Sequence, residues 1–343
     1  MAPKIAVIIP AYNAAAYIEN AVRGILAQTV KELVLIVVDD GSADDTGAIL
    51  RRLQAEDPRL IPITVPNGGP ALARNRALEA VPPGTEYIMF SDADDVMPPD
   101  AAEYALREGR GADLVLMGFE IQGADGSLQR YCEPEQHLTA ADLGGELGRL
   151  YKANLLNQVW GKLYRAPLIL ENGLRFPDYR WGEDRLFIYD CLERAETVAV
   201  LPECKYRYLM HPGESLITRW YDKKFEVCKL SDRRMQALCG RFGVTDERDF
   251  RYMFVKSVFS CLTTLYAPNC SLTAGQKRAE IRRIIRDEQV RARSRDLFGG
   301  PAVRILCAVM RTGLVGLNAF TFRCVAAAGQ LAPRLFTRIK HRK

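Results

Sequence analysis

The stretch IAVIIPAYN, residues 5–13, sets the pattern that decides the fold: an apolar run, Ile5–Ile9, ends at Pro10 and gives way to Tyr12 and Asn13. Similar short runs follow at Leu33–Val38, Leu60–Val65, Tyr87–Phe90 and Leu114–Phe119. Such runs are typical of strands buried on both faces of a parallel sheet. Helical periodicity separates them, over Ala15–Gln28, Asp45–Ala55, Gly69–Ala80 and Pro99–Glu108. We therefore predict an α/β fold with a doubly wound, mostly parallel, Rossmann-like sheet.

The rest of the 343-residue chain changes character twice. Residues 121–221 are less regular, and with residues 1–120 they are predicted to form one α/β domain, 1–221. Helical patterns at Phe225–Phe242, Phe250–Tyr266 and Thr273–Arg293 predict a helical region over 222–298. A tail, residues 299–343, follows the break at Gly299-Gly300-Pro301. The composition, 48% hydrophobic and 26% charged, is that of a folded protein and excludes disorder.

Charge is unevenly distributed along the chain. The net charge is +5, but residues 276–343 carry +12 and the first 275 residues carry −7. The tail is mostly apolar from Pro301 to Leu331, and its best window for spanning a membrane contains Arg323, at a cost of about 2.5–3.5 kcal/mol. We therefore predict a basic amphipathic segment that lies on an anionic membrane surface. Packing against the protein itself or a second subunit stays open, and nucleic-acid binding is not expected because no motif accompanies the basic run.

Cysteine usage and the N-terminus bear on the compartment. The nine cysteines are widely spread and show no Cys-x-x-Cys spacing, so we expect reduced thiols and no zinc site. The apolar run after Lys4 is too short for a signal peptide, so none is expected. Together these features favour a cytoplasmic protein.

Polar residues follow four of the predicted strands, where ligands of open α/β sheets bind. Asp39-Asp40 follows the second strand, and Asp92-Ala93-Asp94-Asp95 follows the fourth. Carboxylates gathered at one sheet edge repel each other unless a cation or hydrogen-bond donors are present. Asp92 and Asp94 are the best metal candidates, and hard oxygen ligands of this kind suit Mg²⁺ or Mn²⁺. Capping of the next helix by Asp95 or Asp100 is the alternative.

Four blocks in order resemble glycosyltransferase family 2, the inverting transferases of the GT-A fold. They are IAVIIPAYN (5–13), VVDDGS (37–42), GGPALARN (68–75) and FSDADD (90–95). A fifth block, WGEDRLF (181–187), resembles the family's Glu-Asp-x-x-Phe segment, and WGKLYR (160–165) resembles a block of its bacterial surface-polysaccharide branch. The resemblance spans about residues 4–219. It implies that residues 1–120 bind a nucleotide and that residues 121–221 bind an acceptor.

The resemblance implies a donor site at the strand ends. Tyr12 would stack on the base of the nucleotide, and Asp40 or Asp39 would accept a hydrogen bond from it. Asp94 would bind the metal on the diphosphate. The nucleotide-sugar site as a whole would comprise Pro10, Tyr12, Asn13, Asp39, Asp40, Ser42, Arg74, Asp92 and Ala93. Arg74 would face the phosphates, with a solvated helix charge as its alternative.

The same resemblance implies that Asp184 is the general base. Glu183 and Trp181 beside it, with Trp160 and Lys162, would contact the donor sugar or the acceptor. The alternatives are a pair of helix N-terminal acids for Glu183-Asp184 and core packing for the tryptophans. His211 would be a further metal ligand or a structural histidine. Residues 211–215, with Arg207 or Arg219, would belong to a loop that closes over the diphosphate.

The function implied is an inverting, metal-dependent glycosyltransferase of surface polysaccharide biosynthesis. It would use Mn²⁺ or Mg²⁺ to move a sugar, from a UDP-sugar before other donors, to a hydroxyl of a glycan or lipid-linked acceptor at the inner face of the membrane. One alternative is a non-catalytic partner in a membrane-associated assembly system. The other is a sugar nucleotidyltransferase, which is disfavoured because Pro10–Tyr17 lacks the glycines and lysine of a phosphate-binding loop.

Overall fold

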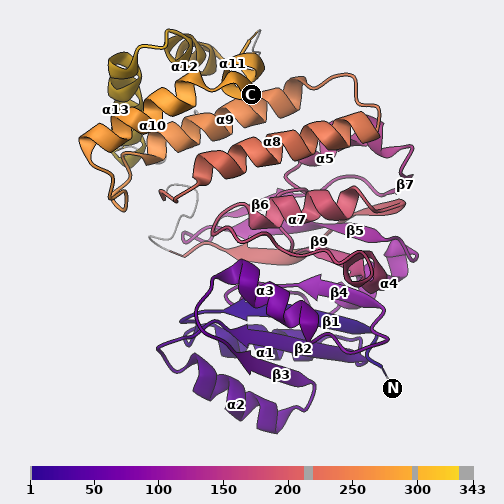
Figure 1. The fold of residues 1–343 in the computed structure, drawn as a ribbon. Helices are drawn as coiled ribbons and strands as arrows, with labels where there is room; N and C mark the ends of the chain where they lie inside the picture. The colour runs from indigo at the N-terminus through magenta and orange to yellow at the C-terminus, as the bar shows by residue number, and fades with distance from the viewer. Residues whose placement is uncertain (1, 212–218, 296–299, 332–343) are drawn as a thin grey trace. The chain divides into compact units, whose positions relative to one another are not determined.

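A computed structural model describes residues 2–211, 219–295 and 300–331 (Figure 1). Its strands are β1 (Ile5–Ala11), β2 (Leu33–Asp39), β3 (Leu60–Thr64), β4 (Tyr87–Phe90), β5 (Leu114–Gln122), β6 (Leu128–Tyr131), β7 (Gln136–Thr139), β8 (Lys162–Arg165) and β9 (Thr197–Leu209). Its helices are α1 (Ile18–Leu26), α2 (Thr46–Glu56), α3 (Pro70–Glu79), α4 (Ala101–Gly109), α5 (Leu143–Lys152), α6 (Ala166–Leu170), α7 (Glu183–Leu192), α8 (Lys224–Arg241), α9 (Arg248–Thr264), α10 (Ala274–Arg286), α11 (Glu288–Arg293), α12 (Pro301–Arg311) and α13 (Val315–Leu331). The chain divides into two compact units, residues 1–214 with 238–244 and residues 215–237 with 245–343.

The first unit is built on one sheet with the strand order β3-β2-β1-β4-β8-β5-β9-β7 and with β6 beside β5. Strands β1 to β4 are parallel, with Ile5 opposite Leu33 and Tyr87. This part confirms the predicted α/β fold, since each predicted strand is present and helices α1 to α3 connect them. The strand order reverses between β1 and β4, and ligands of such sheets bind beside a reversal of this kind.

The other half of the sheet is mixed, and the sequence pattern did not reveal it. Strand β8 lies between β4 and β5 and is antiparallel to both, whereas β9 is parallel to β5. Strand β8 has only four residues, and two of them, Lys162 and Arg165, are charged. A segment of four residues is too short to show a hydrophobic periodicity, and its pairing depends on strands that are distant in sequence.

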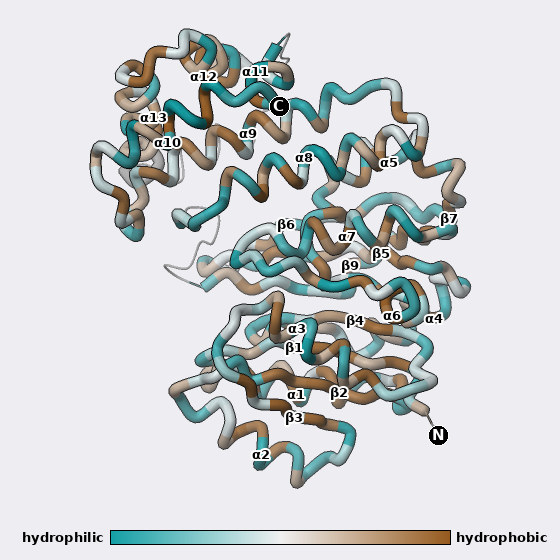
Figure 2. Tube along the Cα trace, in the orientation of Figure 1, coloured by the Kyte–Doolittle hydropathy of each residue, from teal (hydrophilic) through white to brown (hydrophobic). Residues whose placement is uncertain are grey.

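The core of the first unit lies on both faces of its sheet. Every residue of β2 is buried, and the tube of β1 and β2 is largely brown in Figure 2. Farther along the sheet, Phe90 meets Phe176 and Phe187 edge to face, while the rings of Phe176 and Phe187 stack at 3.9 Å. Phe90 is the last residue of β4, two positions before Asp92, so this ring packing anchors the strand end that leads into the site.

The second unit is helical, as predicted. Its core includes Ile281, Ile284 and Ile285 of α10, and the rings of Phe259 and Phe322 approach to 5.8 Å. The helix predicted over Thr273–Arg293 is in fact two helices. Asp287 between them is extended, with φ −61° and ψ 133°, and its side chain caps α11 by accepting from the Val290 amide. The capping preference of Asp thus interrupts a pattern that is otherwise continuous.

Candidate active site

The candidate site lies where β1, β2 and β4 end. The loops after β1 and β2 are joined by reciprocal bonds: the Asn13 amide donates to Ser42 Oγ at 2.9 Å, and the Ala43 amide donates to Asn13 Oδ1 at 2.9 Å. Asn13 has φ 48°, in the left-handed region that Asn tolerates. Asn13 and Ser42 therefore shape the edge of the site through each other, while Tyr12 beside them is 55% exposed and available for stacking.

The two acids after β2 have different partners. Both are buried. The oxygens of Asp40 accept from the amides of Gly68 and Gly69 at 2.8 Å each, which fastens the loop before α3. Asp39 accepts from the Ser42 amide through Oδ1 at 3.0 Å. Because both oxygens of Asp40 are already engaged by main-chain donors, Asp39 is the better candidate for contact with a base.

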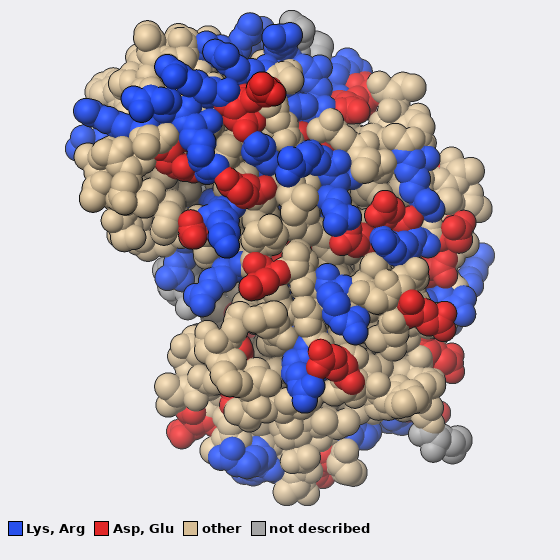
Figure 3. All heavy atoms as spheres, viewed as in Figure 1, with Lys and Arg blue, Asp and Glu red and all other residues tan. Residues whose placement is uncertain are grey.

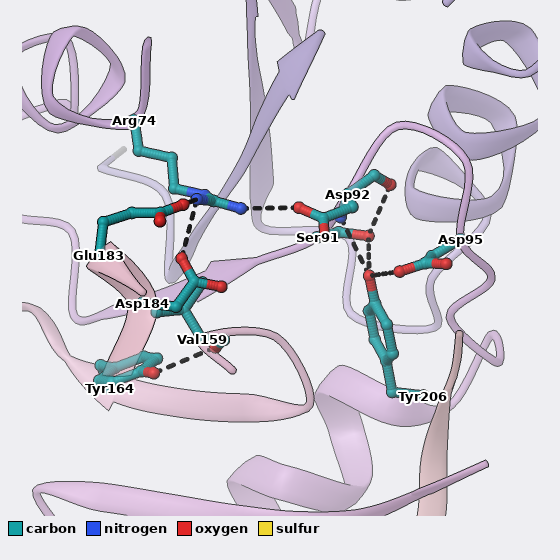
Figure 4. Close-up of polar contacts among 9 residues, drawn as sticks. All are labelled: Arg74, Ser91, Asp92, Asp95, Val159, Tyr164, Glu183, Asp184 and Tyr206. Carbon is teal, nitrogen blue, oxygen red and sulfur yellow. Dashed lines mark hydrogen bonds and ion pairs between the residues drawn. The ribbon is translucent and has the colours of Figure 1, made fainter. Parts of the chain in front are cut away.

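Tyr206 of β9 organises the segment after β4. Its hydroxyl donates to Asp95 Oδ2 at 2.7 Å and accepts from the Asp92 amide at 3.0 Å (Figure 4). The Leu209 amide donates to Asp95 Oδ1 at 3.0 Å. Burial raises the pKa of Asp95 well above its usual value, and the charges of Asp92 and Asp94 raise it further. The sequence analysis did not identify Tyr206 as a site residue. The alternation of Tyr206 and Tyr208 around Arg207, which is typical of a strand, was the one signal available.

The capping alternative for Asp95 and Asp100 is wrong. Asp95 bonds to β9, as described above. Helix α4 begins at Ala101, and the side chain of Asp100, at the N-cap position, makes no capping hydrogen bond. The Asp100 carboxylate pairs instead with Lys205 at 2.6 Å.

Asp94 and His211 lie together, although 117 positions separate them in the sequence. Nε2 of His211 is 3.3 Å from Oδ2 of Asp94, and the imidazole packs on the ring of Tyr17 with centroids 4.5 Å apart. Nε2 is buried and has no hydrogen-bond partner of good geometry within the described ranges. Mg²⁺ and Mn²⁺ use one or two protein groups together with substrate phosphates and water, and this pair fits such a cation. Across residues 2–211, 219–295 and 300–331, no three His, Cys, Asp or Glu side chains are grouped as a metal site of their own.

Arg74 links the acids of the site. Its Nη2 donates to Asp92 at 2.8 Å, and its Nη1 donates to Asp184 at 2.9 Å and to Glu183 at 3.3 Å (Figure 4). The side chain is only 4% exposed, so the alternative of a solvated helix charge is wrong. This triple pairing could not be inferred from the sequence, because Glu183 and Asp184 lie more than 100 positions from Arg74.

Glu183 and Asp184 occupy the first turn of α7, after Gly182 at the N-cap with φ 80°. Burial, then the charge of Asp184, raises the pKa of Glu183 to about 7. Burial also raises the pKa of Asp184, against the effect of Arg74, which favours the ionised carboxylate. The helix N-terminus stabilises such acids as well, so the predicted helix-start position holds and is compatible with a base.

Three of the residues predicted to contact sugar or acceptor are buried, namely Glu183, Trp160 and Lys162. Trp160 is a core residue whose ring stacks on Tyr206 at 4.5 Å. Lys162 is also buried and donates to the carbonyls of Gln158 and Trp160, and burial lowers its pKa to about 7. The core alternative therefore holds for Trp160, and the same burial leaves Lys162 a structural role. Trp181 is half-buried, with the guanidinium of Arg185 5.7 Å from its ring centre.

The remaining predicted residues have separate places. Pro10 lies in β1, and Ala93 is buried within the segment after β4. Arg207 bonds to Glu120 at 2.9 Å. Of the loop predicted over residues 211–215 to close over the diphosphate, all but His211 lies outside the described residues.

The known proteins that this chain resembles in sequence are glycosyltransferases. Residues 6–154 match the family described as glycosyl transferase family 2. The chain is 31% identical over 220 residues to the uncharacterized glycosyltransferase EpsJ of Bacillus subtilis (strain 168), covering 62% of this chain and 63% of that protein. It is 28% identical over 223 residues to the putative teichuronic acid biosynthesis glycosyltransferase TuaG of the same organism, covering 64% of this chain and 83% of TuaG.

A solved structure resembles the chain along most of its length. Residues 1–349 of S. aureus TarS, crystallised with UDP-GlcNAc, align with a TM-score of 0.67 and 20% identity, covering 96% of this chain and 92% of that one. This likeness confirms the GT-A type α/β fold followed by a helical region.

Proposed function

We propose that this chain, whose residues 6–154 match glycosyl transferase family 2, belongs to that family and transfers a sugar from a nucleoside-diphosphate donor to a hydroxyl group. The donor class we propose first is a UDP-sugar, since S. aureus TarS, which shares the fold, was crystallised with UDP-GlcNAc. The transfer reaction itself depends on the side chains of the candidate site.

The observation that carries the proposal is the Arg74 cluster. One buried guanidinium bonds both Asp92, at the donor end of β4, and Asp184, the candidate base on α7. The cluster therefore holds a carboxylate able to accept a proton beside a carboxylate able to contact a nucleotide sugar. Proximity of these two functions is what a single displacement requires.

In the proposed reaction Asp184 accepts the proton of the acceptor hydroxyl while that oxygen bonds to the anomeric carbon of the donor sugar. The bond between the anomeric carbon and the diphosphate oxygen breaks, its electron pair leaves with the nucleoside diphosphate, and the configuration inverts. Burial suits Asp184 to this task because a raised pKa makes the carboxylate a stronger base. Arg74 holds the carboxylate in place and keeps it ionised.

The donor would lie along the ends of β1, β2 and β4. Tyr12 would stack on the base, Asp39 would accept a hydrogen bond from it, and Asp92 would lie near the ribose. Asp94, with His211, would hold Mn²⁺ or Mg²⁺. When bound, such an ion stabilises negative charge on the departing diphosphate.

The acceptor we propose is a glycan or a lipid-linked glycan of a surface polysaccharide. The similarity to TuaG supports this choice, because TuaG is a putative glycosyltransferase of teichuronic acid biosynthesis. A lipid-linked acceptor would place the reaction at the inner face of the membrane. No helix within the described residues has the length and apolarity needed to cross a bilayer.

Calorimetric titration with UDP, GDP, CDP and dTDP, each with Mn²⁺ and with a chelator, tests the donor site. We expect one nucleotide, UDP first, to bind in a metal-dependent way, and Asp94→Ala to weaken that binding. Absence of binding by any nucleotide to folded protein would support a non-catalytic partner instead. Unchanged Mn²⁺ dependence in Asp94→Ala would move the metal to other residues.

A further inference from the structure

The helical unit exposes apolar side chains on its last two helices. Within the described residues ten large hydrophobic side chains are exposed, and four of them fall in a span of sixteen residues. They are Ile305 (62% exposed), Leu314 (60%), Leu317 (41%) and Phe320 (68%). Scattered single side chains of this kind are ordinary on a protein surface, but a local group indicates an interaction surface.

Helices α12 and α13 are packed into the second unit, and their exposed apolar side chains lie on the faces that do not take part in this packing. Met310 and Cys307 of α12 and Phe322 of α13 are buried, and Phe322 packs against Phe259 of α9. The buried Asn318 donates to the carbonyls of Val309 and Leu314, which ties α13 to the end of α12 and to the turn between them. Each helix therefore has one face in the core of the unit and another that remains exposed.

The exposed faces are basic as well as apolar. On α12, Arg304 and Arg311 are exposed beside Ile305, and on α13 Arg323 is exposed three residues after Phe320. On neighbouring α10, Arg278, Arg282 and Arg286 are exposed at intervals of four residues, opposite the buried Ile281 and Ile285. Lys and Arg gather over this unit in Figure 3. No acidic residue follows Asp296 in the sequence.

From this combination we propose that the α12–α13 surface, defined as Arg304, Ile305, Arg311, Leu314, Leu317, Phe320 and Arg323, docks on an anionic lipid bilayer. Apolar side chains enter the boundary between head groups and acyl chains, and arginines pair with lipid phosphates. A second copy of the chain is the weaker occupant, because two such surfaces would bring like charges together. The docking proposal rests on the proposed function in one respect: docking would bring the protein to a lipid-linked acceptor.

Co-sedimentation of the full chain with vesicles tests this surface. One set of vesicles contains equal parts of phosphatidylglycerol and phosphatidylcholine, and the other contains phosphatidylcholine alone. We expect binding to the anionic set, about tenfold weaker for Phe320→Ser and weaker still for Leu317→Ser with Phe320→Ser. Leu128→Ser removes a side chain of intermediate exposure, 55% against 68% for Phe320 and 41% for Leu317, from β6 and is the matched control, with binding as in the unchanged protein. Arg304→Gln with Arg311→Gln should reduce the preference for anionic vesicles.

Equal binding by the unchanged protein and the Leu317–Phe320 double variant would overturn the proposal. Sedimentation without vesicles tests whether a second copy of the chain occupies the surface. If the unchanged protein were a dimer that did not bind vesicles, and the double variant were a monomer, the surface would be one of self-association. That result would also overturn the proposal. UDP binding is measured in the same samples. If the unchanged protein bound UDP but not anionic vesicles, the docking surface alone would be refuted. If it bound anionic vesicles but not UDP, the proposed function alone would be refuted.

Discussion

Arg74 balances three carboxylates inside the protein, and the site's electrostatics follow from that single residue. A buried ion pair contributes modestly to stability as a pair, but removal of one partner leaves charge buried without compensation. At Arg74 the remaining partners would be Asp92, Glu183 and Asp184. The residue-scale predictions concern this cluster.

Arg74→Met is expected to lower the free energy of unfolding by about 3–5 kcal/mol at neutral pH, because it leaves buried carboxylates uncompensated. The deficit should shrink at acid pH as those carboxylates take up protons. Arg76→Met is the matched control on the same helix, since Arg76 is exposed and, among the described residues, pairs with Glu79. Urea denaturation measures both variants. A loss as small as that of the control would mean that the cluster is not electrostatically coupled.

Asp184→Asn is expected to lower the transfer rate by about 10²–10⁴-fold while UDP binding stays nearly unchanged, because the amide cannot accept the acceptor's proton. Glu193→Gln is the control, because Glu193 lies at the other end of α7 and pairs with Arg194 at the surface. Radiolabelled sugar transfer measures the rate, and calorimetry measures binding. Comparable transfer by Asp184→Asn would remove Asp184 as the base.

Glu183 gives the site a pH dependence of stability. Burial raises its pKa from 4.5 to about 7, so between these values the folded protein binds a proton that the unfolded chain has released. The free energy of unfolding should therefore fall as pH rises through this window, by about 1.4 kcal/mol per pH unit at most. Denaturation of the unchanged protein and of Glu183→Gln at several pH values measures the difference. A slope of opposite sign would show that Glu183 is ionised throughout.

At the scale of elements, β9 holds the segment between β4 and α4. Its Tyr206 hydroxyl bonds both Asp92 and the buried Asp95, and its Leu209 amide holds the other oxygen of Asp95. The carboxylates of the candidate site are thus positioned by β9, a strand from the other half of the same sheet. Residues that do not themselves touch a ligand can in this way fix the orientation of those that do.

Tyr206→Phe is expected to cost about 1–3 kcal/mol of stability, because it leaves Asp95 with one fewer donor in a buried position. The looser segment should also weaken metal-dependent UDP binding. Tyr131→Phe is the control, because it removes a hydroxyl from a half-buried ring that stacks on Phe119. Thermal unfolding and calorimetry distinguish the two. If Tyr206→Phe lost stability but kept full nucleotide affinity, β9 would support the fold without positioning the donor site.

At the scale of the whole molecule, charge is divided along the chain. The first 275 residues carry −7 and the remainder carries +12, so the part with the candidate site and the part with the α12–α13 surface have opposite signs. Salt should affect their interactions differently. Screening acts over about 8 Å at physiological ionic strength and about 3 Å at 1 M.

Vesicle binding by the full chain is therefore expected to fall steeply as salt is raised from low concentration to 1 M, because contacts between arginines and lipid phosphates lie at the surface. Metal-dependent UDP binding, measured in the same buffers, should change less because Arg74 is buried and its carboxylate partners are at least partly buried. Sedimentation and calorimetry give the two curves. Salt-independent vesicle binding would indicate that apolar insertion alone holds the protein on the bilayer.

The sequence by itself determined the α/β architecture, the parallel strands β1 to β4 and the helical character of the second unit, because burial periodicity is local. It also determined which acids follow β2 and β4, and it offered a helix start as the alternative for Glu183 and Asp184, since strand and helix ends are marked by residue type. Tertiary structure decided the rest. The place of β8 between β4 and β5, the pairing of Asp94 with His211 and the joining of Asp92 to Asp184 through Arg74 all depend on contacts between residues distant in sequence. Periodicity carries no record of such contacts, because they are fixed only when the sheet closes and its loops meet at one edge.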